Sequence, residues 1–436
     1  MRSKLTIPYA VGHAKQITIP WEQDLLGNAY GVEARDGNAL SRYGIVPLEE
    51  YQTDMAMLQG VWKVADGVLE WTTEGNLLLR ASQTYDAICN QSFNYVQVLN
   101  CPDCLLLLTD CGVWMLQNGC ETAQKLDVPP FVKGLMHKGR CFALTGKDNR
   151  VYFSSLENPT CFEDDQGGGW LAFDERGGKC VALAVVANKL CVFRQHSVEM
   201  VVATADRRDM SVSSLSFACG RLYGNTVASN GNEAVFLTDW GLWSFDGKVF
   251  SRLAKHLDCS FAAVNDYATA TWCDHGYLLH CKLAFDGAKV GCEKASFVNN
   301  ALVVVSNGVV VLRGLDCTHL VTASDNQALF TANGIVYTIT QQQQDQPRGC
   351  SLQTTFNSHK GKTVQFVTVA TTYPVTMVVH YNNTSKTFCL QASNQPQSVF
   401  VNATGKRFKF EFSANGKLCL SPVTVDYLVY KGGVKP

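Results

Sequence analysis

The amino-acid sequence predicts an all-β fold: a β-propeller of about six to eight blades, followed by a small antiparallel β-sandwich-like module. One observation is a repeated unit, in which two short apolar runs flank a turn of Gly, Asn or Asp. In residues 234–246, AVFL and LWSF flank the turn at Asp239, Trp240 and Gly241. This unit recurs roughly seven times at spacings of a few tens of residues. Long helical periodicity is nearly absent.

The composition supports a large core and argues against several classes of partner. The 436 residues are 46% hydrophobic and 17% charged, with a formal net charge of −1. Such a chain has no overall field to attract nucleic acid, and we expect no sequence-specific nucleic-acid binding. No apolar run approaches the ~18 residues of a membrane span, and no apolar core of a signal peptide follows the basic start. We therefore expect the chain to fold in a cytoplasm.

The N-terminal part is predicted to be irregular. We assign residues 1–56 to a segment that contributes to the propeller, with a turn and the start of a strand in residues 33–44. Residues 49–58 are the strongest helical candidate, but they are few and only weakly amphipathic.

Residues 57–340 are predicted to form the propeller. Their turns recur at residues 65–67, 74–76, 110–112, 146–149, 239–241, 274–276, 307–308 and 333–334. The flanking runs are almost continuously apolar, as expected where each sheet is buried between two neighbours. A pair of β-sandwiches is the alternative fold, because it has similar strand spacing. One hairpin pattern throughout this range favours the propeller.

The repeated pattern stops at the polar sequence QQQQDQPRG, and we expect a linker at residues 341–349. Residues 350–436 alternate polar and apolar residues more cleanly. Phe408, Phe410 and Phe412 fall on one face of a predicted strand, and Lys409 and Glu411 fall on the other. This alternation is typical of antiparallel strands with one solvated face, as in a small sandwich or jelly-roll-like module.

Cysteines are the sharpest metal-binding candidates. Cys101 and Cys104 form a C-x-x-C pair, with Cys111 and Cys120 downstream. Four thiolates complete a tetrahedral zinc site, but the second pair has the wrong spacing for a zinc knuckle. Most of the eighteen cysteines lie singly in apolar runs, where they are typical of small buried hydrophobic residues in a reducing compartment. We favour free thiols and expect no metal or cofactor.

Other patterns that suggest chemistry are incomplete. Gly146 and Lys147 lack the rest of a phosphate-binding loop, so we interpret them as a hairpin turn. The acidic residues 163–165 precede the glycines at 167–169, which could hold a cation but are more typical of a flexible loop.

Candidate acids and bases are defined by residue type alone. Glycosidase carboxylates are recognised by their spatial separation, which the sequence does not contain. The acidic candidates are Asp164, Asp165, Asp206, Asp209 and Asp258. The histidines are scattered at positions that include His137, His196, His256, His275 and His280. We expect no catalytic residues among them and no enzymatic activity.

Trp240 and Trp243 flank Gly241 in a predicted hairpin. A tryptophan beside a turn can stack on a sugar, cap a blade edge or enter a subunit interface. We favour the interface.

Several segments resemble a known family. They are residues 150–162 (RVYFSSLENPTCF), residues 182–202 (ALAVVANKLCVFRQHSVEMVV) and residues 232–245 (NEAVFLTDWGLWSF). Residues 35–42 (RDGNALSR) and 405–410 (GKRFKF) extend the match to both ends of the chain. With these motifs, residues 140–258 are similar to the β-propeller tail-hub or nozzle proteins of tailed bacteriophages. Cys161 and Phe162 stand where this family commonly has tryptophan.

The resemblance implies a non-enzymatic virion protein at the tail or head–tail junction, assembled in the bacterial cytoplasm. Its implied partners are further copies of itself in a ring, with hexamers common in the family, and neighbouring tail, adaptor or fibre proteins. The alternative is a propeller that binds or cleaves carbohydrate during host-receptor recognition. A weaker third option is an intracellular scaffold propeller, although WD-type repeats are absent from the sequence.

Overall fold

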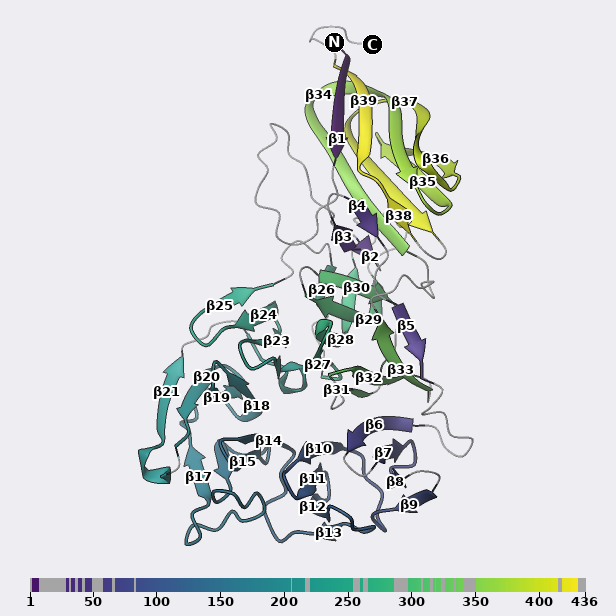
Figure 1. Ribbon diagram of the computed structural model, residues 1–436. Coiled ribbons are helices and arrows are strands. Elements are labelled where there is room, and N and C mark those ends of the chain that lie inside the picture. Colours follow the sequence, from purple (N-terminus) through teal and green to yellow (C-terminus); the bar gives the residue numbers. More distant parts are fainter. Residues whose placement is uncertain are drawn as a thin grey trace.

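The computed structural model describes most of the chain as β-strand (Figure 1). The described residues are 2–7, 29–30, 33–35, 38–40, 44–48, 58–64, 67–81, 84–204, 206–215, 220–253, 259–261, 266–285, 297–306, 309–313, 317, 319–322, 326–332, 335–340, 350–414 and 418–429. Within them, two short 3-10 helices, η2 (Arg207–Asp209) and η3 (Gly224–Thr226), accompany the strands.

The predicted propeller is confirmed. Six four-stranded antiparallel sheets and one further unit, β27–β30 of a larger sheet, make seven blades within the described chain. Blade 1 is β6 (Leu58–Val64), β7 (Gly67–Thr72), β8 (Leu77–Ala81) and β9 (Thr84–Ala87). Blade 2 is β10 (Val96–Asn100), β11 (Cys104–Thr109), β12 (Gly112–Gln117) and β13 (Gln124–Lys125). Blade 3 is β14 (Lys133–His137), β15 (Arg140–Leu144), β16 (Arg150–Phe153) and β17 (Gly169–Ala172).

The remaining blades complete the circle. Blade 4 is β18 (Cys180–Val186), β19 (Lys189–Arg194), β20 (Val198–Val202) and β21 (Ser211–Leu215). Blade 5 is β22 (Ala228–Ser229), β23 (Ala234–Thr238), β24 (Gly241–Phe245) and β25 (Phe250–Arg252). Blade 6 is β27 (Thr269–Cys273), β28 (Gly276–Phe285), β29 (Phe297–Val305) and β30 (Val309–Arg313), and β26 (Cys259–Phe261) also pairs with β28. Blade 7 is β31 (His319–Thr322), β32 (Ala328–Ala332), β33 (Ile335–Thr340) and β5 (Gly44–Pro47).

The blades pack radially, with apolar side chains shared between neighbours. Trp62 and Leu69 of blade 1 join Leu107 of blade 2 in one cluster, and Phe193 of blade 4 joins Phe236 of blade 5 in another. Buried on both faces, these strands need apolar residues at nearly every position, which explains the continuous apolar runs. Described hairpins also confirm the predicted turns near 74–76, 110–112, 146–149, 239–241 and 274–276.

The ring is closed by a strand from the N-terminal part of the chain. β5 pairs with β33, placing Ile45 opposite Ile339, so that residues more than 290 positions apart complete blade 7. Leu58 and Val61 of blade 1 then pack against Leu329 in blade 7. The first and last blades are thus joined by hydrogen bonds and apolar contact.

Residues 1–56, expected to contribute to the propeller, divide between the propeller and the C-terminal module. β1 (Arg2–Ile7) pairs with β39 (Val423–Val429) in the C-terminal module. The hairpin of β3 (Glu33–Arg35) and β4 (Asn38–Leu40) joins the same module through β38 (Cys419–Leu420). β5 completes blade 7, and β2 (Ala29–Tyr30) pairs with β30 of blade 6. β1 pairs in the module because β39 has a free edge there, along which all six residues of β1 find a partner.

The C-terminal module is built on two long strands (Figure 1). Its strands are β34 (Cys350–Thr371), β35 (Val375–Tyr381), β36 (Thr384–Leu390), β37 (Ser393–Ala414), β38 and β39. β2 (Ala29–Tyr30) connects it to the propeller by pairing with both β30 and β34. Phe408, Phe410 and Phe412 are buried in its core, as their alternation predicts. Register shifts along β34 mark bulges that bend this long strand.

Several sequence predictions lie outside the described residues, among them the turns at 307–308 and 333–334. The linker at 341–349 falls between β33 and β34, and the helical candidate at 49–58 is described only at Leu58, which begins β6.

Closure of the ring predicts a selective loss of stability. Ile45→Asp places a charge where β5 packs against the core between blades 6 and 7, and we expect it to lower the free energy of unfolding by about 2–4 kcal/mol. Ile335→Asp, on the exposed side of β33, is the matched control and is expected to change it by less than about 0.5 kcal/mol. Thermal and urea unfolding measure both, and equal losses would argue against closure by β5.

Candidate functional site

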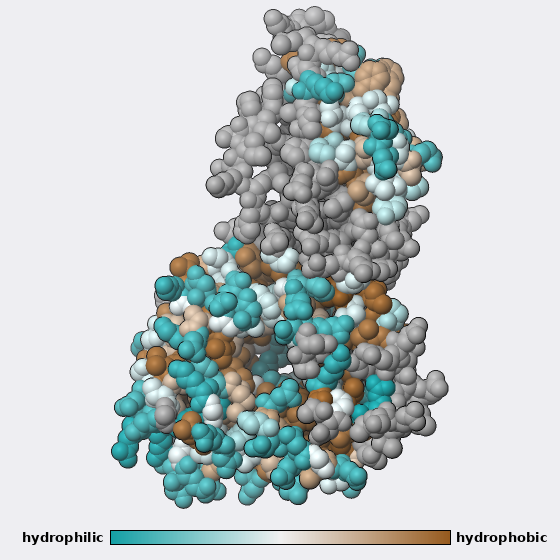
Figure 2. Space-filling view, in the orientation of Figure 1, coloured by the Kyte–Doolittle hydropathy of each residue, from teal (hydrophilic) through white to brown (hydrophobic). Residues whose placement is uncertain are grey.

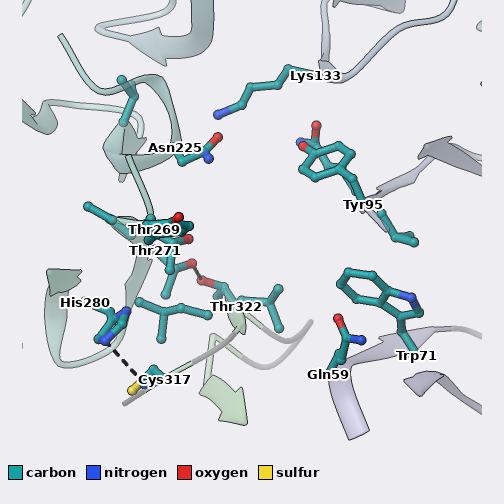
Figure 3. A pocket seen from close by; sticks show the side chains of 18 of the residues that line it. Gln59, Trp71, Tyr95, Lys133, Asn225, Thr269, Thr271, His280, Cys317 and Thr322 are labelled. Carbon is teal, nitrogen blue, oxygen red and sulfur yellow. Dashed lines mark hydrogen bonds between the residues drawn. The ribbon is translucent and has the colours of Figure 1, made fainter. Parts of the chain in front are cut away.

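A cavity of about 860 Å³ lies at the centre of the propeller. Its wall comes mainly from the first strands of the blades, β6, β10, β14, β27 and β31. Figure 2 shows the propeller hollowed near its middle, and Figure 3 shows the lining side chains. Polar residues on these inner strands therefore meet across the axis, although they are far apart in the sequence.

Lys133, the first residue of β14, is one of two lysines in this wall, and the other is Lys282. Gln97 of β10 fixes the start of β14, because its side-chain amide donates to the Gly134 carbonyl and accepts from the Gly134 N–H, each at 3.2 Å. Gly134 also permits the close approach of the two strands, since a Cβ there would lie 2.9 Å from Leu99. The backbone of Lys133 is thereby fixed at the blade 2–blade 3 junction, from which its ammonium reaches η3.

The charge of Lys133 is poorly compensated. Its Nζ donates to the Gly224 carbonyl at 2.8 Å, and no carboxylate in the described chain forms an ion pair with it. Burial lowers the pKa of Lys133 to about 7, because removal from water disfavours the ammonium form. The acid of the wall, Asp266, pairs instead with Arg221 at 3.3 Å.

Aromatic rings form another part of the wall. The indole N–H of Trp71 donates to the Phe93 carbonyl at 3.1 Å, which fixes the ring plane. Tyr95 lies beside it (Figure 3), and burial raises the pKa of its phenol, so the hydroxyl stays neutral. Tyr267 is 79% exposed and has Lys282 Nζ 5.4 Å from its ring centroid.

The opposite wall carries hydroxyls and an imidazole. Thr271 and Thr322 join their hydroxyls in a hydrogen bond between blades 6 and 7. The Cys317 N–H lies 3.3 Å from His280 Nε2, which accepts this hydrogen bond (Figure 3). His280 is thus the one histidine of the sequence candidates that the cavity wall includes.

The four candidate cysteines are not brought together into one group. Cys101 and Cys104 face each other across the β10–β11 turn, where the Cys101 N–H donates to the Cys104 carbonyl at 2.9 Å. Their thiols share a hydrogen bond, which lowers the pKa of Cys104. Cys111 packs in the core of blades 1 and 2, and Cys120 is exposed. In the described residues, no group of three or more His, Cys, Asp and Glu side chains is arranged to hold a metal ion.

The acidic loop is held by an arginine. Arg207 of η2 forms an ion pair with Asp164 and donates to the Gly168 carbonyl at 3.0 Å, which ties blade 4 to the loop of blade 3. Asp206 caps η2 by accepting from the Arg208 N–H at 2.9 Å. Asp164 and Asp206 therefore have structural partners. Asp258 lies outside the described residues.

Trp240 and Trp243 do not form a joint platform. Trp240 is 56% exposed at its turn, whereas Trp243 packs against the core between blades 4 and 5. At the predicted turn of residues 146–149, the Lys147 N–H donates to Thr145 Oγ1 at 3.2 Å, and Asp148 accepts a hydrogen bond from the Tyr152 hydroxyl. These contacts are expected of a hairpin turn.

The remaining histidine candidates lie apart from the cavity. His137 is buried at the end of β14, His196 follows β19, and His275 contacts the Ile339 carbonyl at 3.2 Å. His256 lies outside the described residues.

The sequence analysis missed Lys133, Tyr95 and Asn225. A usable signal was present, because Lys133 is a charged residue in the first strand of a repeat unit, and Gln59 and Gln97 are polar residues in the first strands of two other units. Polar residues in the first strands of several units indicate that polar side chains surround the propeller axis.

Comparisons with known proteins identify no family. No protein-family model and no curated protein matches the sequence. Among solved structures, a streptogramin B lyase is similar over 69% of this chain and 98% of its own, with 10% identity and a TM-score of 0.40. BamB from Moraxella catarrhalis is similar over 69% of this chain and 99% of its own, with 11% identity and a TM-score of 0.37. The extracellular domain of a putative one-component system from B. thetaiotaomicron is similar over 82% of this chain and 47% of its own, with 8% identity and a TM-score of 0.44.

At these identities the likeness extends to the fold alone. Separately, no described helix has the length and apolar character needed to cross a membrane.

The depressed pKa of Lys133 predicts a pH-dependent stability. An unfolded lysine titrates near 10.5, so between about pH 7 and 10 the unfolded chain binds one more proton than the folded chain. The folded state should therefore gain stability as pH rises through this window and lose it as pH falls toward 7. Urea unfolding of the protein and of Lys133→Met at pH 7 and pH 9 measures this gain. A stability difference between the two that does not change with pH would contradict it.

Proposed function

We propose that the protein is a structural, non-enzymatic subunit of a ring in the tail or at the head–tail junction of a tailed bacteriophage. The resemblance of residues 140–258 to tail-hub and nozzle proteins supports this proposal, and that range covers β15 to β25, the greater part of three blades. The main structural support for this proposal is that the chain has two parts. A closed propeller is joined to a module of two long strands, and the module ends in edge strands.

The edges of the module suit contacts between copies. In the described chain, β36 hydrogen-bonds to β35 alone and β1 to β39 alone, so each has a second side available for strand pairing. Unpaired strand edges readily accept another chain. Two different edges on one subunit allow a head-to-tail interface, and such interfaces generate rings when the rotation closes.

An exposed aromatic residue lies on the same module. Phe400 of β37 is 58% exposed, and its ring centroid lies 5.1 Å from that of Phe366. Large exposed aromatic side chains are enriched in the cores of subunit interfaces. The propeller supplies a rigid body behind this surface, because its blades are closed into a ring.

The second candidate function is a carbohydrate-binding propeller, and the axial cavity favours it. Its aromatic walls suit a sugar. Its charged side chains are Lys133, Lys282 and the Arg221-paired Asp266, which is not the pair of carboxylates that glycoside cleavage uses. The cavity therefore favours binding over cleavage.

The ring proposal predicts a defined assembly in solution. Light scattering and electron microscopy of the purified protein should detect a closed oligomer at micromolar concentration. Phe400→Glu should shift it to smaller species while leaving the melting temperature nearly unchanged, because the side chain is already exposed. Val249→Glu, on an equally exposed residue of the propeller, is the control and should leave the assembly intact. A monomer at all concentrations would contradict the proposal.

A further inference from the structure

We propose that the axial cavity binds an acidic monosaccharide, a hydroxyl-rich ring with one carboxylate, and that Lys133 is the counter-ion of that carboxylate. This site is independent of the proposed ring assembly, because it lies on the propeller axis and not on the module.

The size of the cavity fits such a ligand. Ligand pockets commonly measure about 300–1,000 Å³ and combine apolar walls with a few convergent polar groups. The axial cavity, at about 860 Å³, accommodates one or two sugar rings with ordered water.

The charge of the cavity selects an anion. The contact of Lys133 with the Gly224 carbonyl satisfies one N–H but leaves its positive charge without an opposite charge. Asp266, the acid of the wall, is engaged by Arg221. A ligand carboxylate supplies the missing charge, and charge-assisted hydrogen bonds of this kind are about twice as strong as neutral ones.

Neutral groups beside Lys133 select hydroxyls. Figure 3 shows the Asn225 amide and the Lys133 ammonium turned toward the same space, with Tyr95 across from them. Because the phenol of Tyr95 stays neutral, it can both donate and accept a hydrogen bond, as can the amide of Asn225.

Other polar residues of the wall are already engaged. Gln97 bonds the backbone of Gly134, Asn94 bonds Asp110, and Gln59 bonds the Thr73 carbonyl at 3.0 Å. These three amides are therefore less available to a ligand than the side chains of Lys133, Asn225 and Tyr95.

The aromatic wall completes the site. The ring of Trp71 is fixed by its hydrogen bond to Phe93, and its centroid lies 6.5 Å from that of Trp62. Trp71 is itself only 5% exposed, so the open ring of the wall is that of Tyr267, and an aromatic face of this kind covers the apolar C–H face of a sugar ring. A ligand with both a carboxylate and an apolar ring face matches this cation and this aromatic wall better than a small inorganic anion does.

Calorimetry on the full-length protein tests this inference, with glucuronate and N-acetylneuraminate as probes. We expect one of these acidic sugars to bind at least tenfold more tightly than glucose, which lacks the charge, and than acetate, which lacks the ring. Lys133→Gln should weaken that binding at least tenfold, whereas Lys133→Arg, which keeps the charge, should retain most of it. Lys248→Gln, an exposed lysine of blade 5, is the control and should bind as the unmodified protein does.

The pH dependence provides a second readout. With the pKa of Lys133 near 7, affinity should fall as pH rises from 6 to 9, by up to tenfold per unit above the pKa of the complex. Circular dichroism confirms that each variant is folded. Absence of binding by both acidic sugars at 10 mM, equal binding of acetate, or unchanged binding by folded Lys133→Gln would overturn the inference. A ring that assembles normally without binding either sugar would leave the proposed function standing and reject this site.

Discussion

Closure of the propeller between β33 and β5 is the constraint on which the rest of the structure depends. Blade 7 takes its outer strand from residues 44–47, with Ile45 opposite Ile339. Because β6 follows β5 in the chain and packs against β32, this pairing also brings the first and last blades into contact. The axial cavity needs the closed ring, since its wall includes Gln59 of blade 1 and Thr322 of blade 7.

Two cations of the propeller, the buried Arg194 and the partly buried Lys133, are accommodated in different ways. Arg194 is 1% exposed and is surrounded by acceptors, with Glu199 at 3.2 Å and the Gly178 carbonyl at 2.9 Å. It also donates to Asp174, which lowers the pKa of that carboxyl. Lys133 has a carbonyl and no described carboxylate partner. Burying a charge without a partner is costly, so Arg194 depends on its acceptors, and a bound anion would offset the cost at Lys133.

The two parts of the chain present different kinds of surface. The propeller buries its strands between neighbouring blades and encloses a cavity, whereas the module exposes strand edges and the ring of Phe400. In Figure 1 the described ends of β1 and β39 lie together at the far tip of the module. An assembly role for the module and a ligand site on the propeller axis therefore use separate surfaces and are compatible in one molecule.

The sequence by itself determined the local structure. Turn residues such as Gly241 and Gly276 mark hairpins because they adopt positive φ, and the alternation of Phe408, Phe410 and Phe412 follows from the two-residue period of a strand. Only the tertiary structure decided the long-range partners. The pairing of β1 with β39 and of β5 with β33, and the meeting of Lys133 with Tyr95 and Asn225, depend on which segments close a ring. A repeat predicts that blades exist, but the local pattern is the same in every blade and does not say which residues of different blades face one another across the axis.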